Sequence, residues 1–110
     1  MKTDRQLEKE KLVGQAIIYL ALTQKVPLKP YNLKWEKEIV SMYDLMVVDF
    51  INYKTNKRWT LDFSEDLFNL NKPFNPDIDK YIPTSANITT KLIVRIAAFI
   101  WMFSKDYLLE

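Results

Sequence analysis

Three aspartates near the middle of the chain are the residues whose type best suits metal binding or acid chemistry. Asp49 and Asp62 face each other when residues 44–53 pair with residues 58–63 as a β-hairpin, and Asp44 begins the first of these segments. Like charges opposed across two strands destabilise a sheet, so a hard cation or a neighbouring basic side chain must compensate. Calcium and magnesium usually take more oxygen ligands than two strand carboxylates supply. Neutralisation by lysine or arginine, or a strand register other than this one, is therefore favoured over a metal site.

A second group of residues combines positive charge with aromatic rings. Tyr53, Lys54, Lys57 and Arg58 surround a predicted turn. Further basic and aromatic residues precede the hairpin, namely Lys25, Lys29, Tyr31, Lys34 and Trp35. Cations interleaved with aromatic rings bind phosphates and stack on bases, although a hairpin tip is ordinarily charged because it faces solvent. Nucleic-acid binding at this turn is the alternative function that the sequence offers.

The composition excludes most kinds of catalytic site and cofactor-binding site. The chain contains no histidine and no cysteine, so the commonest general base, the commonest metal ligand and thiolate chemistry are all absent. Its one glycine, Gly14, cannot build a glycine-rich phosphate loop. The serines lack a histidine that would activate them. We predict a protein that is not an enzyme and that uses no metal or cofactor.

Length and composition indicate one globular domain over residues 1–110. Hydrophobic residues make up 48% of the chain and charged residues 27%, which argues against disorder. The net charge of +2 indicates nucleic-acid binding only if basic residues cluster. The longest apolar run, residues 96–103, is far shorter than the roughly 20 residues of a membrane span, and no signal peptide is recognisable. We expect a soluble, cytoplasmic protein with no membrane partner.

The elements that must position these residues begin with a helix at residues 3–23. Its first turns are charged, whereas the residues from Val13 onward are mostly apolar, so we expect the first half to face solvent and the second half to enter the core. Pro27 and Pro30 then require an extended chain. Residues 33–42 fit either a strand or a helix, and a strand is favoured because the following hairpin needs a neighbour.

Residues 44–63 carry the clearest β-sheet pattern of the chain. A turn at residues 54–57, in which Asn56 can take a positive φ, sets Tyr53 opposite Arg58. The same register produces the opposed aspartates. One face of the hairpin is expected to enter the core, and it holds Val48, Phe50, Trp59, Leu61 and Phe63.

The segment between the hairpin and the last helix is predicted to be largely irregular. Ser64 can cap a short helical turn. Residues 71–84 are expected to form a loop because they contain three prolines. Apolar residues should hold this loop against the body, whereas Asp77 and Asp79 are expected to be solvated.

The chain ends in a strongly apolar helix at residues 85–109. Lys91, Arg95 and Lys105 line up on one narrow polar seam and nearly every other position is apolar, so the helix must be covered on several sides. Its last turns carry aromatic and aliphatic residues of the kind enriched at protein interfaces. We predict a partner-binding surface formed by Trp101, Phe103, Tyr107 and Leu108.

Together these segments predict an α+β fold with an N-terminal helix, a small antiparallel sheet of two or three strands, a proline-containing loop and a long apolar C-terminal helix. The leading function is a small non-enzymatic protein-interaction module that binds another protein or a second copy of itself. Compact proteins without catalytic residues are typical of inhibitors, immunity proteins and adaptors of phages and mobile elements. The alternative is a small nucleic-acid-binding module that uses the basic and aromatic turn.

Overall fold

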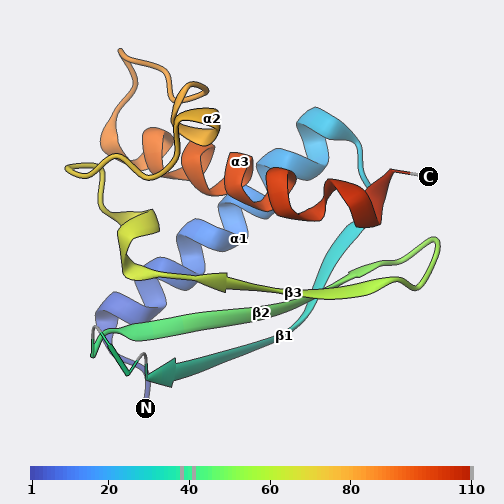
Figure 1. Cartoon of the computed structure of the whole chain (residues 1–110), viewed down its shortest axis with the longest axis horizontal. Helices are drawn as coiled ribbons and strands as arrows, with labels where there is room; N and C mark the ends of the chain where they lie inside the picture. The colour runs from blue at the N-terminus through green and yellow to red at the C-terminus, as the bar shows by residue number, and fades with distance from the viewer. Residues whose placement is uncertain (38, 41, 110) are drawn as a thin grey trace.

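The computed structural model describes residues 1–37, 39–40 and 42–109 as a two-layer α+β fold (Figure 1). The elements follow in the order α1 (Asp4–Gln24), β1 (Leu28–Lys37), β2 (Asp44–Asn52), β3 (Arg58–Phe63), the 3-10 helix η1 (Glu65–Phe68), α2 (Pro76–Asp79) and α3 (Ile88–Leu108). The strands form an antiparallel sheet in the order β1-β2-β3, and α1 and α3 lie over the same face of it. The predicted fold class is confirmed. Among the described helices, none combines the length and the apolar character needed to cross a membrane.

Helix α1 begins at a capping box, in which the side chains of Thr3 and Gln6 each accept a hydrogen bond from the backbone N–H of the other residue. The Gln6 N–H donates to Thr3 Oγ1 at 3.1 Å, and the Thr3 N–H donates to Gln6 Oε1 at 2.9 Å. This capping box supplies acceptors for N–H groups that have no partner within the helix. The helix ends before Lys25, whose φ of 54° lies in the left-handed region, and Pro27 then prevents continuation. The prediction of an N-terminal helix is confirmed.

Strand β1 resolves the ambiguous segment 33–42 in favour of a strand. It pairs antiparallel with β2 and has a register irregularity between Pro30 and Asn32. Pro30 is tolerated because β1 lies at the edge of the sheet. Of the ambiguous segment, residues 33–37 belong to β1, residues 39–40 form a turn, and residues 38 and 41 lie outside the described residues.

The β2–β3 hairpin has a register two residues away from the predicted one. Arg58 pairs with Ile51 rather than with Tyr53, and Asp49 pairs with Thr60 rather than with Asp62. The prediction of opposed aspartates is therefore wrong. Because the shift is even, every side chain keeps its predicted face. The expected core face is confirmed, since the buried side chains include Val48, Phe50, Trp59, Leu61 and Phe63.

Asn52 accounts for the shift. Its backbone N–H donates to Lys57 O at 2.8 Å and closes the loop one residue earlier than predicted. Its side-chain Oδ1 accepts from the N–H groups of Lys54 and Thr55 at 3.0 and 3.2 Å. Asn56 takes the expected positive φ, at 63°. The alternation of the strands allows more than one register. The hydrogen bonds from the loop N–H groups to Asn52 select this one.

Helix α3 lies across the sheet beside α1. Asn87 caps its start by accepting a hydrogen bond from a backbone N–H of the first turn at 2.8 Å. The side chains of Ile96 and Ile100 are at 0% exposure and join Phe50 and Phe63 of the sheet in the core. Full burial of each such side chain stabilises the fold by about 1.5–3 kcal/mol. The sheet, α1 and the segment after β3 together supply the cover that the apolar helix requires.

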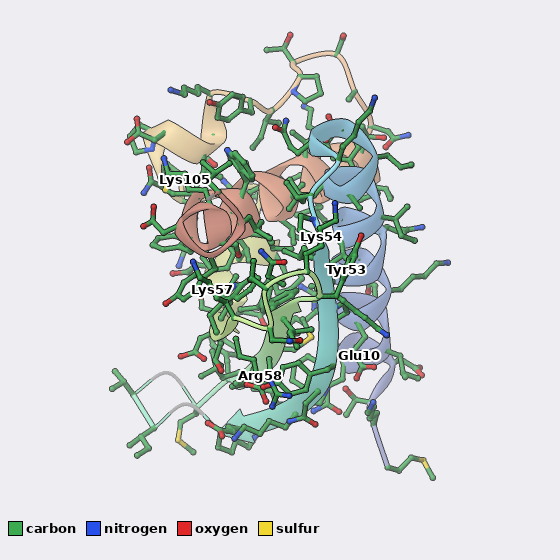
Figure 2. The ribbon with its side chains drawn as sticks, turned by 90° about the vertical axis from the view of Figure 1, so that its right-hand side faces the viewer. Glu10, Tyr53, Lys54, Lys57, Arg58 and Lys105 are labelled. Carbon is green, nitrogen blue, oxygen red and sulfur yellow. The ribbon has the colours of Figure 1, made fainter. Side chains whose placement is uncertain are left out.

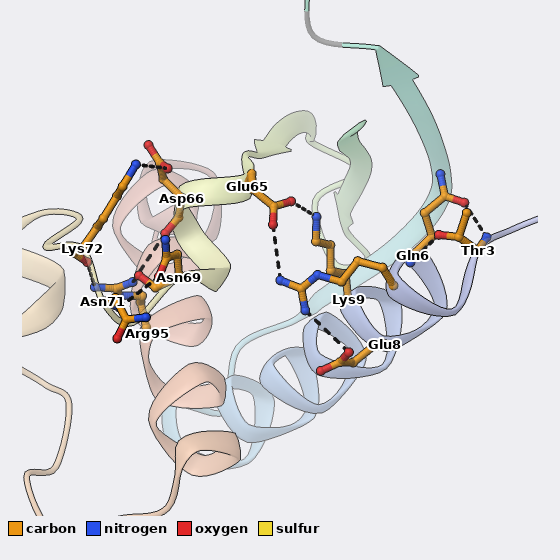
Figure 3. Close-up of polar contacts among 11 residues, drawn as sticks. Thr3, Gln6, Glu8, Lys9, Glu65, Asp66, Asn69, Asn71, Lys72 and Arg95 are labelled. Carbon is orange, nitrogen blue, oxygen red and sulfur yellow. Dashed lines mark hydrogen bonds and ion pairs between the residues drawn. The ribbon is translucent and has the colours of Figure 1, made fainter. Parts of the chain in front are cut away.

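Arg95 departs from the predicted helical wheel. The sequence places it on an exposed seam, but it is buried at 2% exposure, so that prediction is wrong. Its Nε donates to Asp79 Oδ1 at 3.0 Å. Its terminal nitrogens donate to the carbonyls of Asn69 and Lys72 at 2.9 and 2.8 Å (Figure 3). The carbonyl of Asp66 lies at 3.5 Å from the same guanidinium. Arg95 thereby fixes the proline-containing loop to α3.

Asp79 is also more enclosed than predicted. Its carboxylate accepts the N–H groups of Phe74 and Asn75 at 2.8 and 3.3 Å, in addition to Arg95. Burial alone raises the pKa of Asp79, but the Phe74 N–H and the Arg95 guanidinium lower it, and the resulting pKa lies below its usual value. Ile78, the preceding residue, is fully buried. The loop is therefore held by charge-assisted hydrogen bonds as well as by the expected apolar contacts.

A second buried cation joins α1 to η1 (Figure 3). Lys9, at 3% exposure, forms an ion pair with Glu65, and Arg5 lies 3.3 Å from the same carboxylate. The Lys9 Nζ is 5.3 Å from the centroid of the Phe68 ring. Burial alone raises the pKa of Glu65, but Lys9 and Arg5 lower it below its usual value. Lys9 is thus an exception to the expectation that the first half of this helix faces solvent.

Candidate functional site

Three segments that are distant in the sequence meet at one end of the molecule, at the right in Figure 1. The Tyr53 N–H donates to Pro27 O at 3.0 Å, which ties the β2–β3 loop to the connection between α1 and β1. Trp59 Nε1 donates to Ser104 Oγ at 2.8 Å, which ties the hairpin to the last turns of α3. The surface formed by residues 25–31, 51–60 and 103–109 is termed the hairpin end.

The hairpin end concentrates positive charge, and it faces the viewer in Figure 2. Its basic residues are all exposed, namely Lys25, Lys29, Lys54, Lys57, Arg58 and Lys105. The acidic residue in its three segments is Asp106. The remaining sequence, with Glu110 left aside, holds ten basic and twelve acidic residues. The charges of a nearly neutral chain are therefore separated in space, which attracts anions to one end of it.

Most of these cations are not held in ion pairs with other described residues. Lys25, Lys29, Lys54 and Lys105 form no ion pair with another residue in the described part of the chain. The Arg58 guanidinium lies 5.1 Å from the centroid of the Tyr31 ring, which is a cation–π contact that leaves its charge uncompensated. A phosphate that binds here does not have to displace a carboxylate from these groups.

Partly exposed aromatic rings belong to the same three segments. The exposed fractions are 49% for Tyr31, 57% for Tyr53, 49% for Phe103 and 38% for Tyr107. The Tyr107 ring stacks on Trp59 with a centroid distance of 4.8 Å and an interplanar angle of 10°. Asn52 Nδ2 donates to Tyr107 O at 2.9 Å and fixes the backbone of the same residue. A ring held in place by packing loses little freedom when a second ring stacks on it.

The structure brings residues of both predicted sites together. The hairpin end holds Tyr53, Lys54, Lys57 and Arg58 of the nucleic-acid hypothesis and Phe103 and Tyr107 of the partner-binding hypothesis. Leu108 is buried in the core at 6% exposure, and Trp101 lies half-buried between α3 and α1. The four residues of the partner-binding hypothesis therefore do not form one exposed surface.

Sequence reasoning missed Lys105 as a site residue because it assigned this lysine to the polar seam of α3 alone. Single side-chain hydrogen bonds from Asn52 and Trp59 join the last turns of α3 to the hairpin, and no pattern in the sequence marks such contacts. Of the residues that precede the hairpin, Lys25, Lys29 and Tyr31 join the site. Lys34 and Trp35 lie farther along β1, outside it.

Asp49 is a hydrogen-bond acceptor on the open face of the sheet. Thr60 Oγ1 donates to its carboxylate at 2.5 Å and Asn32 Nδ2 donates at 3.0 Å. These hydrogen bonds, Thr60 first, lower the pKa of Asp49 below its usual value. Asp44 forms an ion pair with Lys37 at 3.0 Å. Within the described ranges, no three acidic, histidine or cysteine side chains are grouped to hold a metal ion.

A large open hollow lies away from the hairpin end, between the proline-containing loop and the first turns of α3. Its volume is about 730 Å³, and its lining includes Lys72, Lys91 and Arg95. Arg95 already donates to Asp79 and to loop carbonyls. Arg95 is the buried cation that would anchor an anion in this hollow, and it is therefore already paired within the protein.

Known proteins give no further guide to the site. No protein-family model, curated protein or solved structure matches the chain. The function must therefore be inferred from the arrangement of this chain's own residues.

Proposed function

We propose that the protein is a non-enzymatic nucleic-acid-binding protein whose hairpin end holds single-stranded nucleic acid. The observation that carries this proposal is the separation of charge, with six exposed basic residues and one acidic residue in the segments of one end. Basic side chains that contact phosphates release counterions, which supplies most of the affinity of sequence-independent binding. The exposed rings of Tyr53 and Tyr107 beside these cations offer surfaces on which bases stack.

Single strands suit this end better than a duplex does. Proteins that read a duplex usually insert a helix or a β-ribbon into a groove, whereas this end presents a short loop beside the end of a helix. The face of a base is open to an aromatic side chain only when the base is not stacked within a duplex. Tyr53, at 57% exposure, is placed to accept such a base.

The composition of this end also favours nucleic acid over an acidic protein surface. Five of its six basic residues are lysine, and protein interfaces are depleted in lysine but enriched in arginine. The competing prediction is an apolar protein interface that includes Phe103 and Tyr107. The two predictions differ in salt dependence, because phosphate binding weakens steeply as salt rises and an apolar interface does not.

Fluorescence anisotropy with a labelled single strand, and with the duplex of the same sequence, tests the proposal at low salt. The single strand should bind more tightly. Tyr53→Ala should weaken its binding by about 1–3 kcal/mol, the stacking contribution of one base. Tyr81→Ala is a matched control because Tyr81 is 60% exposed, close to the 57% of Tyr53, and lies outside the hairpin end.

Two results would contradict the proposal. One is the absence of binding to either oligonucleotide at low salt. The other is an equal loss of affinity in Tyr53→Ala and Tyr81→Ala, since a general effect of removing an exposed ring would then explain both variants.

A further inference from the structure

The hairpin end continues onto the open face of the sheet, which is the face that α1 and α3 do not cover (Figure 1). On this face Arg58 of β3 pairs with Ile51 of β2, and its guanidinium extends across β2 to the Tyr31 ring of β1. Tyr31 falls between the paired positions Pro30 and Asn32, where the register of β1 is irregular. Arg58 and Tyr31 therefore belong both to the hairpin end and to the open face.

Next to this contact, three polar side chains form a row across all three strands. Asp49 of β2 pairs with Asn32 of β1 and with Thr60 of β3. Thr60 Oγ1 donates to Asp49 Oδ1 at 2.5 Å, and Asn32 Nδ2 donates to Asp49 Oδ2 at 3.0 Å. The group of Asn32, Asp49 and Thr60 is termed the polar row. It follows directly on the contact between Arg58 and Tyr31, because Arg58 and Thr60 are successive residues on the same face of β3.

The polar row presents hydrogen-bond acceptors to a ligand. Asp49 is partly exposed in the central strand, and Asn32 and Thr60 on either side of it are exposed. The hydrogen bonds from Thr60 and Asn32 hold the pKa of Asp49 below its usual value, so the carboxylate is ionised at neutral pH. An ionised carboxylate has about four acceptor sites. One hydrogen bond to each oxygen therefore leaves acceptor capacity on both oxygens.

The charge of Asp49 determines which part of a bound strand can lie against it. A carboxylate repels phosphates, whereas Arg58 beside it attracts them. Two residues of a β-strand span about 7 Å, so a nucleotide whose phosphate contacts Arg58 can place its base at the polar row. The group that meets Asp49 is then a base that offers N–H donors, and contacts to bases are the ones that specify sequence.

Guanine is the base whose edge matches the two oxygens of a carboxylate. Its Watson–Crick edge carries two adjacent donors, the ring N1–H and the exocyclic N2 amino group. Adenine and cytosine offer an amino group beside a ring nitrogen that is an acceptor, and a carboxylate repels that nitrogen. Thymine and uracil offer one ring N–H between two carbonyls. These edges are accessible to a protein in an unpaired strand.

We infer that the polar row selects guanine in the single strand that the hairpin end binds. Asp49 accepts hydrogen bonds from N1–H and the N2 amino group of the base. Thr60 and Asn32 are positioning residues, because they hold the carboxylate from both sides, and Arg58 contacts the phosphate of the same nucleotide. This inference rests on the proposed nucleic-acid binding and adds a base preference to it.

Three labelled oligonucleotides of about twelve nucleotides test the inference by fluorescence anisotropy at low salt. One contains thymine alone, the second repeats thymine-thymine-guanine, and the third has hypoxanthine in place of each guanine. The guanine strand should bind at least about fivefold more tightly than the thymine strand, the lower end of what one bidentate base contact supplies. Hypoxanthine is also a purine but lacks the N2 amino group, so the third strand should lose most of this preference.

Two aspartate variants locate the preference on the protein. Asp49→Asn keeps the size of the side chain but puts an amide where the base needs acceptors, so the preference for guanine over thymine should fall below about twofold. Asp62→Asn is the matched control, since Asp62 is exposed on the same face of β3 beyond Thr60 and the change in charge is equal. It should keep the wild-type preference. Both variants should bind the thymine strand at least as tightly as the wild type, because each loses a negative charge.

Several results would overturn the inference. Equal affinity for the guanine and thymine strands, with both bound, would remove the base preference and leave nucleic-acid binding in place. Equal affinity for the guanine and hypoxanthine strands would attribute the preference to stacking of a purine. An equal loss of preference in the two variants would attribute it to net charge. Binding of guanosine monophosphate without binding of any oligonucleotide would assign the polar row to a free nucleotide, and no binding at all would contradict the proposed function as well.

Discussion

Two groups of cations in this protein differ in what surrounds them. Arg95 and Lys9 are buried at 2% and 3% exposure, and each meets a carboxylate. The cations of the hairpin end are exposed, and four of them lack an ion pair with any other described residue. A buried charge that loses its partner costs several kcal/mol, so the fold must satisfy the first group. Water satisfies these four lysines, which leaves their charge for a ligand.

This difference separates stability from binding. Substitutions of the buried cations should lower the free energy of unfolding, whereas substitutions of the exposed cations should change affinity for an anion with little effect on unfolding. A variant that lowered the free energy of unfolding and the affinity for an anion to the same extent would contradict the distinction between the two groups.

Arg95→Ala should have the largest effect on stability. It removes the ion-pair partner of Asp79 and one donor each from the carbonyls of Asn69 and Lys72, so the free energy of unfolding should fall by about 3–5 kcal/mol in urea titrations. Lys105→Ala on the same helix is the control, with an expected loss of under about 1 kcal/mol. Equal losses in the two variants would mean that the burial of Arg95 does not stabilise the fold.

Asn52→Ala should have the next largest effect, because it removes the side chain that orders the β2–β3 loop and that donates to Tyr107 O. The expected loss is about 1–3 kcal/mol, the cost of leaving buried polar groups unsatisfied. The control is Asn56→Gly, which should stay within about 0.5 kcal/mol of wild type because glycine takes a positive φ readily. A larger loss in Asn56→Gly than in Asn52→Ala would contradict the role given to Asn52.

Acid should destabilise the protein through Asp79 and Glu65, whose pKa values lie below their usual values in the fold. Such carboxylates stabilise the fold above their unfolded pKa of about 4, and this contribution is lost as the pH falls through the folded pKa. The urea midpoint should therefore be nearly constant from about pH 7 to 5 and decline below about pH 4. Asp79→Asn should show a smaller decline, and a profile parallel to wild type would exclude Asp79 as a cause.

Lys54→Ala should have the smallest effect on stability. Lys54 is exposed and forms no ion pair with another described residue, so the free energy of unfolding should stay within about 0.5 kcal/mol of wild type. Its affinity for a single-stranded oligonucleotide at low salt should nevertheless fall. A loss of stability without a loss of affinity would mean that Lys54 stabilises the fold, as the buried cations do, and does not bind the oligonucleotide.

The sequence was a good guide where one pattern determines the structure. Alternation along the two strands correctly assigned Phe50 and Leu61 to the core face. It did not determine the register, because a shift of two residues keeps every face. The register is decided by local hydrogen bonds to the side chain of Asn52. The sequence does not single out Asn52, because any nearby asparagine or aspartate can form such hydrogen bonds.

Arg95 and the hairpin end were harder to predict, for one physical reason. The helical wheel places Arg95 with Lys91 and Lys105, and only the folded loop supplies the carbonyls that allow its burial. The cations around the turn were visible as a group, but their association with Lys105 depends on contacts between distant segments. Spacing along a chain does not encode contacts of that kind.

The salt dependence of oligonucleotide binding tests the central claim most directly. The logarithm of the binding constant of a single strand should fall linearly with the logarithm of salt concentration, with a slope of about −0.7 per phosphate contacted. The double variant Lys29→Glu/Lys54→Glu should bind weakly and with a shallower slope. Lys11→Glu/Lys80→Glu changes the net charge equally at exposed positions outside the hairpin end, and it should keep the wild-type slope. Identical slopes in the two double variants, or wild-type binding that does not respond to salt, would contradict the account.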